Sequence, residues 1–124
     1  MSFETILQDI VDACPGCEGL ALMGSDGIPI AHAAPRNADA DEAEENVGVA
    51  GVEFGRILDE VRKAADSLES PPVEEMTVRM GRRSVVLRPV DADTTLVMLL
   101  ADDAIPGKAR FLLRKSLLAI QDEF

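Results

Sequence analysis

The sequence predicts an α+β layer fold with the element order α-β-β-α-β-β-β-α, in which helices cover one five-stranded antiparallel sheet. Two observations indicate this order. Apolar residues recur at helical spacing near the start, middle and end of the chain, and five short apolar segments with strand character lie between them. Gly, Pro and Asp cluster at the joints. No internal repeat is found, so residues 1–124 are expected to form a single domain.

The first three elements are a helix and a hairpin. Residues 2–13 have one apolar face, and Ser2 can cap the helix that they predict. The turn Ser25-Asp26-Gly27 follows, with a glycine that can take a positive φ and an aspartate that can bond its own backbone. Residues 20–23 and 28–31 should therefore pair as antiparallel strands.

A long helix is expected over residues 43–68, after an acidic loop at 34–42. Its apolar residues alternate at spacings of four and three, which gives a heptad-like seam. The seam consists of Val47, Gly51, Phe54, Leu58, Val61, Ala65 and Leu68. The helix also contains Gly48, Gly51 and Gly55, each of which costs about 1 kcal/mol relative to Ala. Close contact with another helix or with the sheet is the expected compensation.

Three strands are predicted next, over residues 73–80, 84–90 and 94–101. Met76, Val78 and Met80 alternate with polar residues, as in a strand with one buried face. The third of these strands is continuously apolar from Leu96, which is typical of a central strand covered on both sides.

The chain is expected to end in a helix with Pro106 in its first turn, capped by Asp102 or Asp103. Its basic side chains Lys108, Arg110, Arg114 and Lys115 are expected to be mainly solvated. The expected core stripe is Ala109, Leu113, Ser116, Leu117, Ile120 and Phe124.

Charge and composition exclude several function classes. The net charge is −11, with no Trp or Tyr, which argues against nucleic acid or an anionic membrane surface as the main partner. Residues 1–75 hold 17 acidic and 4 basic side chains, whereas residues 76–124 hold 6 and 8. An acidic face and a near-neutral or basic face are therefore expected. With no apolar run of membrane-spanning length and no signal-peptide pattern, we expect a soluble cytoplasmic protein without membrane insertion.

Cys14-Pro15-Gly16-Cys17 is the one motif that suggests chemistry, because a Cys-x-x-Cys pair can cycle as a redox pair or bind metal. Here, however, Cys14 follows a helix, so the helix dipole opposes thiolate formation. A structural turn is the favoured interpretation. His32 is the only histidine, and with both cysteines it supplies three metal ligands where zinc usually takes four. We therefore expect no catalytic, cofactor-binding or metal-binding residues.

Motifs for nucleotide or hydrolase chemistry are absent. Gly107-Lys108 lacks the upstream glycine and the following Ser or Thr of a phosphate-binding loop, so the chain itself is not expected to be a GTPase. Arg82 and Arg83 lie at a predicted turn, where they could serve as an arginine finger or simply be solvated charges.

The chain resembles the Roadblock / dynein light chain family. The resemblance rests on the element order, a Gly-x-x-Gly-apolar strand beginning at Gly16, the Asp-Gly turn, the glycine-bearing second helix and the entry Gly107-Lys108-Ala109-Arg110 into the last helix. It covers nearly the whole chain. It implies a profilin-like α/β/α sandwich that dimerises through its third strands and second helices. Bacterial members of this family are partners of small Ras-like GTPases, and those of the gliding-motility type stimulate GTP hydrolysis.

The resemblance and the residues together predict a homodimer. A strand at a sheet edge leaves unpaired N–H and C=O groups, which a second copy can satisfy. The expected interface comprises Gly48, Gly51, Val52, Gly55, Val73, Met76 and Val78. Candidate partner-binding residues are Asp41, Glu44, Glu45, Arg82 and Arg83. The acidic ones can equally stabilise the start of the long helix through its dipole.

Three hypotheses follow for function. The first is a homodimeric regulatory partner of a small Ras-like GTPase that stimulates GTP hydrolysis without catalytic residues of its own. The second is a non-catalytic adaptor light chain that assembles other proteins. The third is a redox or metal protein that uses Cys14 and Cys17.

Overall fold

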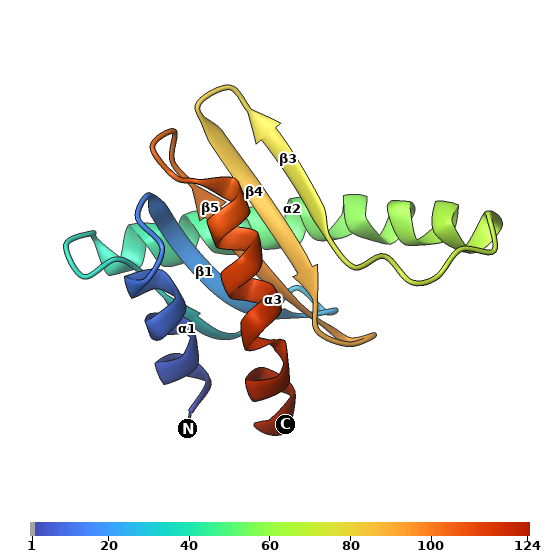
Figure 1. Ribbon diagram of the computed structural model, residues 1–124, viewed down its shortest axis with the longest axis horizontal. Helices are drawn as coiled ribbons and strands as arrows, with labels where there is room; N and C mark the ends of the chain where they lie inside the picture. Colours follow the sequence, from blue (N-terminus) through green and yellow to red (C-terminus); the bar gives the residue numbers. More distant parts are fainter. Residues whose placement is uncertain (1) are drawn as a thin grey trace.

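The computed structural model describes residues 2–124 and consists of three layers (Figure 1). One long helix lies on one face of a five-stranded sheet, and the first and last helices lie side by side on the other face. In chain order the elements are α1 (Phe3–Asp12), β1 (Cys17–Gly24), β2 (Pro29–Ala33), α2 (Ala40–Ser67), β3 (Met76–Met80), β4 (Arg83–Pro89), β5 (Thr94–Leu100) and α3 (Pro106–Asp122). The predicted α+β fold and element order are confirmed.

All neighbouring strands are antiparallel, in the order β2-β1-β5-β4-β3. The apolar strand β5 is central, as its composition predicts, and strands β2 and β3 form the two edges. Alternate residues of β5 point to opposite faces, so that Met98 packs under α1 and α3 while Val97 packs under α2. The sheet therefore has two separate cores, both aliphatic.

The hairpin turn forms as predicted, but its strands are longer and shifted. Gly27 has φ +81°, and the Asp26 carboxylate accepts a hydrogen bond from the Ile28 N–H at 3.0 Å. Leu20 pairs with Ala33, and the register shifts between Leu22 and Met23. Strand β2 begins at Pro29 and extends to Ala33, two residues beyond the predicted end.

The predicted cap of α1 is confirmed, whereas the predicted start of α2 is wrong. Helix α1 is capped by the Ser2 hydroxyl, which accepts a hydrogen bond from the Thr5 N–H at 3.2 Å. Helix α2 begins at Ala40, three residues before the predicted start. The cause is Asp39, whose carboxylate accepts from the N–H groups of Asp41 and Glu42 and turns part of the expected acidic loop into the first helical turn.

Strand β3 and helix α3 also differ from expectation in detail. Strand β3 begins at Met76 and not at Val73, and residues 73–75 connect it to α2 without strand pairing. Neither predicted aspartate caps α3: its N-cap is Ile105, with no side-chain hydrogen bond, and Pro106 stands in the first turn. Phe124, expected in the core stripe of α3, is instead 59% exposed, with its ring centroid 4.9 Å from that of Phe3.

Candidate functional site

Helix α2 is longer than the sheet is wide. Its 28 residues at about 1.5 Å each span roughly 42 Å, whereas five strands at about 4.8 Å spacing give a sheet only about 20–25 Å across. The C-terminal half of α2 accordingly projects beyond the β3 edge (Figure 1). The predicted seam changes environment at this point: Leu58 is fully buried, but Val61 is 37% exposed and Leu68 is 77% exposed. The apolar seam therefore continues where the chain's own sheet no longer covers it.

Strand β3 leaves the adjoining sheet edge open. It pairs with β4 on one side and, within residues 2–124, with no strand on the other. Met76 and Val78 point to the α2 side, where they pack half-buried against the second core. The opposite edge differs, since β2 begins with Pro29, which has no N–H to offer a further strand. Of the two edges, β3 is the better suited to pairing with another chain.

The three glycines of α2 have different surroundings. A Cβ on Gly51 would lie 2.8 Å from Met23 Cε, because this residue is buried against β1 of the same chain. At Gly48 and Gly55 a Cβ would meet no atom within 4 Å. Gly51 therefore permits α2 to approach its own sheet, and it does not belong to an exposed interface. Only Gly48 and Gly55 leave the α2 backbone open to a partner.

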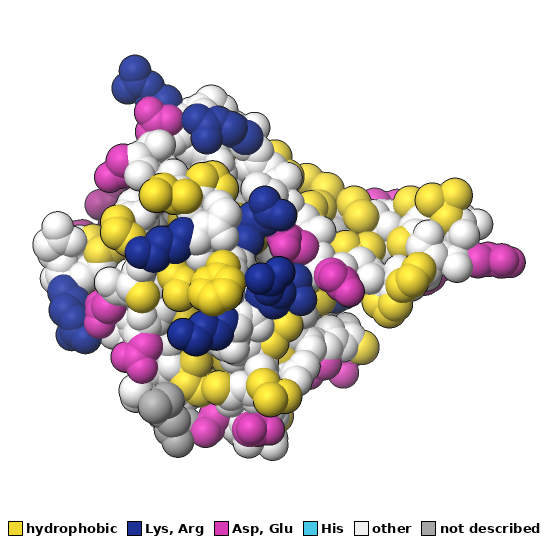
Figure 2. Space-filling model, viewed as in Figure 1, with side chains coloured by type: hydrophobic (Ala, Val, Ile, Leu, Met, Phe, Trp, Pro, Cys, Tyr) yellow, Lys and Arg dark blue, Asp and Glu magenta, His cyan; other side chains and the backbone are white. Residues whose placement is uncertain are grey.

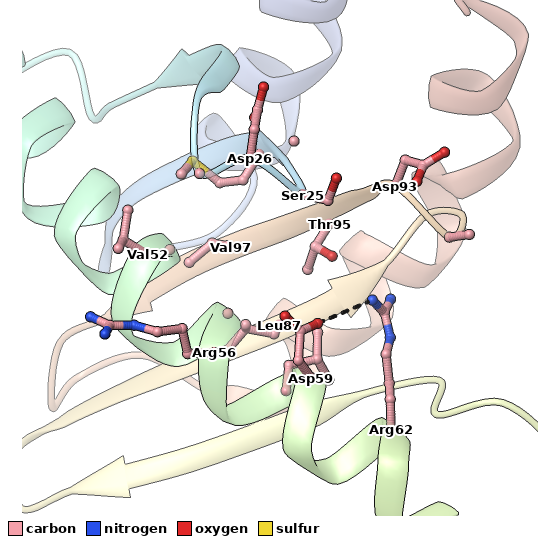
Figure 3. Close-up of a pocket in the computed structure, with 17 residues that line it drawn as sticks. Ser25, Asp26, Val52, Arg56, Asp59, Arg62, Leu87, Asp93, Thr95 and Val97 are labelled. Carbon is pink, nitrogen blue, oxygen red and sulfur yellow. Dashed lines mark ion pairs between the residues drawn. The ribbon is translucent and has the colours of Figure 1, made fainter. Parts of the chain in front are cut away.

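Beside Gly55 lies a hollow of about 180 Å³ between α2 and the β1–β2 and β4–β5 turns (Figure 3). Figure 3 shows Ser25 and Thr95 across the hollow from Asp59 and Arg62, whose ion pair spans 3.8 Å. Its lining is of mixed charge, with carboxylates of Asp26, Asp59 and Asp93 and guanidinium groups of Arg56 and Arg62. Such a lining can accept either a positively or a negatively charged side chain of a partner.

The acidic candidates lie at the start of α2, far along the helix from the overhang. Asp41, Glu44 and Glu45 are all exposed, and Glu44 Oε2 lies 3.5 Å from Nε2 of His32. Their carboxylates stand near the positive end of the helix dipole, so they stabilise the helix whether or not they meet a partner. The structure brings these three residues together on one exposed turn.

Arg82 lies in the β3–β4 turn and Arg83 begins β4, at the end of the sheet away from the hollow. The Arg83 guanidinium donates to Glu18 Oε2 at 2.7 Å across the sheet. Arg82 is exposed beside Gly81, which has φ +63°. The structure therefore separates the two arginines from the hollow and from the acidic start of α2.

The two cysteines are buried free thiols, with Cys14 in the turn after α1 and Cys17 at the start of β1. Burial raises the pKa of the Cys14 thiol, and burial together with the neighbouring Cys14 raises the pKa of Cys17 to about 12. The Cys17 Sγ donates to the Gly19 carbonyl at 3.6 Å. A thiol held protonated in this way is a poor nucleophile and a poor metal ligand. Nowhere in residues 2–124 do three His, Cys, Asp or Glu side chains form a metal-binding group.

Sequence reasoning missed the hollow and the overhang. The hollow joins residues from α2 and two distant turns, so no local pattern could indicate it. The overhang could have been found, because a seam that stays apolar to Leu68 over a helix of this length exceeds what five strands can cover. Across the described residues, 2–124, no helix has the length and apolarity needed to cross a bilayer.

Solved structures match this fold over nearly the whole chain. MglC from Myxococcus xanthus is 30% identical, with 100% of both chains covered and a TM-score of 0.68. The Roadblock/LC7 domain from Streptomyces avermitilis has a TM-score of 0.79 at 14% identity, covering 98% of this chain and 97% of that one. The gliding protein MglB from Thermus thermophilus has a TM-score of 0.77 at 14% identity, covering 91% and 81%.

Profilin II from Acanthamoeba castellanii shares the same layers, with a TM-score of 0.59, 17% identity and 99% and 100% coverage. The fold and the site thus define a profilin-like α/β/α domain that presents an open sheet edge and an overhanging helix. No family model matches the chain, and neither does any curated protein. On its likeness to MglC over the full length, the chain belongs to the Roadblock/LC7 family.

Proposed function

We propose that the protein is a homodimeric regulatory partner of a small Ras-like GTPase, and that it stimulates GTP hydrolysis without catalytic residues of its own. The observation that carries the proposal is the overhang of α2 beside the open β3 edge. The apolar seam of α2 continues to Leu68, whose side chain is 77% exposed. Exposed apolar surface next to unpaired backbone is typical of a surface that another chain covers.

In the proposed dimer the two β3 strands pair antiparallel across a two-fold axis. The overhanging half of each α2 then lies under the partner's sheet, where its seam is buried. Gly48 and Gly55 allow close approach to the α2 backbone. The proposed interface comprises Gly48, Val52, Gly55, Ile57, Val61, Leu68, Val73, Met76 and Val78.

The GTPase part of the proposal rests on family membership and on the character of the remaining surface. The likeness to MglC and to the gliding protein MglB supports a place among regulators. Asp41, Glu44 and Glu45 form an exposed acidic turn, outside the residues of the proposed dimer interface, that suits a basic surface of the GTPase. We assign this turn to contact with the GTPase, whereas the hollow is lined by Val52 and Gly55 of the proposed dimer interface.

The second candidate is an adaptor that binds proteins without changing a reaction rate. It is favoured by the state of the candidate arginine finger. Arg83 is already engaged by Glu18 at 2.7 Å, so only Arg82 is available to a phosphate from this turn. Charge reversal at Arg82 alone should leave GTP hydrolysis unchanged if regulation acts through the GTPase's own active site.

Light scattering tests the dimer. Leu68→Glu places a charge on the overhang, where the monomer makes little contact, and should shift the mass toward that of one chain. Ile105→Glu is the matched control, since Ile105 is 66% exposed but lies at the start of α3, on the other side of the sheet from α2. Equal masses for the wild type and both variants would contradict the proposed interface.

GTP turnover tests the regulation. A purified small Ras-like GTPase from the same organism, loaded with GTP, should hydrolyse it faster at saturating wild-type protein and more slowly with Leu68→Glu. Binding with no change in rate would leave the adaptor hypothesis. If the protein binds the GTPase in neither its GTP-bound nor its GDP-bound state, this GTPase is rejected as a partner.

A further inference from the structure

The outward face of α3 is apolar where a solvated helix would carry charge. Ala109, Leu113 and Ile120 are fully buried and supply the contact with the sheet. On the opposite side, Phe111 is 49% exposed and Leu118 is 70% exposed, two turns apart. These two side chains add little to the core, so their exposure is not explained by the folding of the domain.

Basic side chains surround this apolar stripe. Figure 2 shows Lys and Arg gathered around hydrophobic side chains over α3, and the helix contributes Lys108, Arg110, Arg114 and Lys115. Arg114 lies with its Cζ 5.8 Å from the centre of the Phe111 ring. We name the surface formed by these four cations, Phe111 and Leu118 the α3 face.

The cations of the α3 face are largely unneutralised. Arg110 pairs with Glu75, but among residues 2–124 no carboxylate forms an ion pair with Lys108, Arg114 or Lys115. Helix α3 holds four basic side chains against a single carboxylate, that of Asp122, while α2 holds three basic and eight acidic ones. In a protein of net charge −11, this local excess of positive charge is selective for an acidic partner.

We infer that the α3 face docks an acidic amphipathic helix of another protein, whose apolar side chains cover Phe111 and Leu118 while its carboxylates meet Arg114 and Lys115. The spacing of the outward residues at 111, 114, 115 and 118 repeats at three and four, as in a helix that pairs with a second helix. This surface lies on the opposite side of the sheet from α2, so the proposed dimer leaves it accessible.

An anionic membrane is the less suitable partner for this face. Lipid recognition by charge usually uses clusters of four to eight Lys or Arg, and only three here are unpaired. The rest of the protein, which has a net charge of −11, repels an anionic bilayer that is large enough to extend past this patch. A helix with a few carboxylates and two apolar anchors matches the size of the patch better.

The probe is a synthetic 16-residue peptide with Glu on its polar face and Leu at positions i, i+3, i+4 and i+7. Titrated into ¹⁵N-labelled full-length protein, it should shift amide signals of α3 and bind saturably. Arg114→Glu/Lys115→Glu should weaken binding at least tenfold, and Phe111→Ala should weaken it several-fold. Lys63→Glu is the control, an exposed cation on α2 that should leave binding unchanged.

Four outcomes would overturn the inference. One is no saturable binding, or amide shifts on another face. A second is equal binding of a peptide of the same charge with Ser in place of Leu, which would mean that the α3 face recognises charge alone. A third is binding to phosphatidylserine vesicles but not to the peptide. The fourth is a lower mass for Arg114→Glu/Lys115→Glu in light scattering, because the occupant would then be a second copy of this chain.

Discussion

Gly51 of α2 lies directly over Met23 of β1, so closely that a Cβ at this position would stand 2.8 Å from Met23 Cε. Met23 is itself buried, with 3% of its surface exposed. The contact sets the distance between helix and sheet, and it explains why a glycine with poor helix propensity occupies the middle of a long helix.

Substitution of two α2 glycines should therefore affect different properties, the stability of the fold in one case and the dimer in the other. Gly51→Leu overfills the contact with Met23 and should lower the free energy of unfolding by about 1–3 kcal/mol. Gly55→Leu meets open space in the single chain, so its unfolding should be unimpaired, while the dimer should weaken because the proposed partner approaches there. Urea denaturation and light scattering on both variants check this. A fully dimeric Gly55→Leu would count against a contact at this glycine.

Removal of the α2 cap should destabilise the fold. The Asp39 carboxylate accepts from the N–H groups of Asp41 at 3.0 Å and Glu42 at 3.2 Å. Asp39→Ala should cost about 1 kcal/mol of unfolding free energy, since both donors lose their partner and the helix dipole loses a charge. Asp41→Ala serves as the comparison and should cost less. Equal losses would argue against the capping role.

The β4–β5 turn should give the protein an acid-sensitive increment of stability. Burial opposes ionisation of Asp91, but hydrogen bonds from the Asp93 N–H and from the hydroxyl and N–H of Thr94 outweigh it and hold the carboxyl pKa below 3.8. A lowered folded-state pKa stabilises the fold above the unfolded value, and this contribution is lost as pH falls through the folded value.

Asp91→Ala should therefore reduce stability by about 1–2 kcal/mol at neutral pH. Thermal unfolding of wild type and variant should converge below pH 4, where the wild-type carboxyl becomes protonated. A difference between them that does not depend on pH would show that the charge of Asp91 contributes nothing.

The contribution of Cys17 to stability should be lost at high pH, whereas that of Asp91 is lost at low pH. The folded state raises the pKa of Cys17 from 9.0 to about 12 through burial, so the unfolded chain loses its proton first as pH rises. Stability from this group is complete below pH 9 and declines between pH 9 and 12. Cys17→Ala should flatten that decline. Native protein should also react slowly with iodoacetamide at pH 8, and rapid labelling without unfolding would revive the redox hypothesis.

Local patterns were enough to predict most elements of this fold. The apolar run from Leu96 indicated the central strand, and Gly27 indicated the hairpin turn, because side-chain periodicity and backbone φ depend on neighbours in the chain. Boundaries were harder. The start of α2 at Asp39 and the cap of α3 at Ile105 depended on which of several nearby polar residues reached the helix N–H groups.

By itself, the sequence determined the order of elements, the aliphatic composition of the core and the charge asymmetry between the two parts of the chain. Only the tertiary structure decided that Gly51 faces its own sheet while Gly48 and Gly55 face open space, although the three are separated by less than two helical turns. It also decided that Val61 and Leu68 lie beyond the edge strand β3, where the sheet does not cover them. The physical reason is that burial depends on where the sheet ends beneath the helix. Helical periodicity in the sequence indicates which face a residue occupies, but it does not indicate the position of the sheet edge.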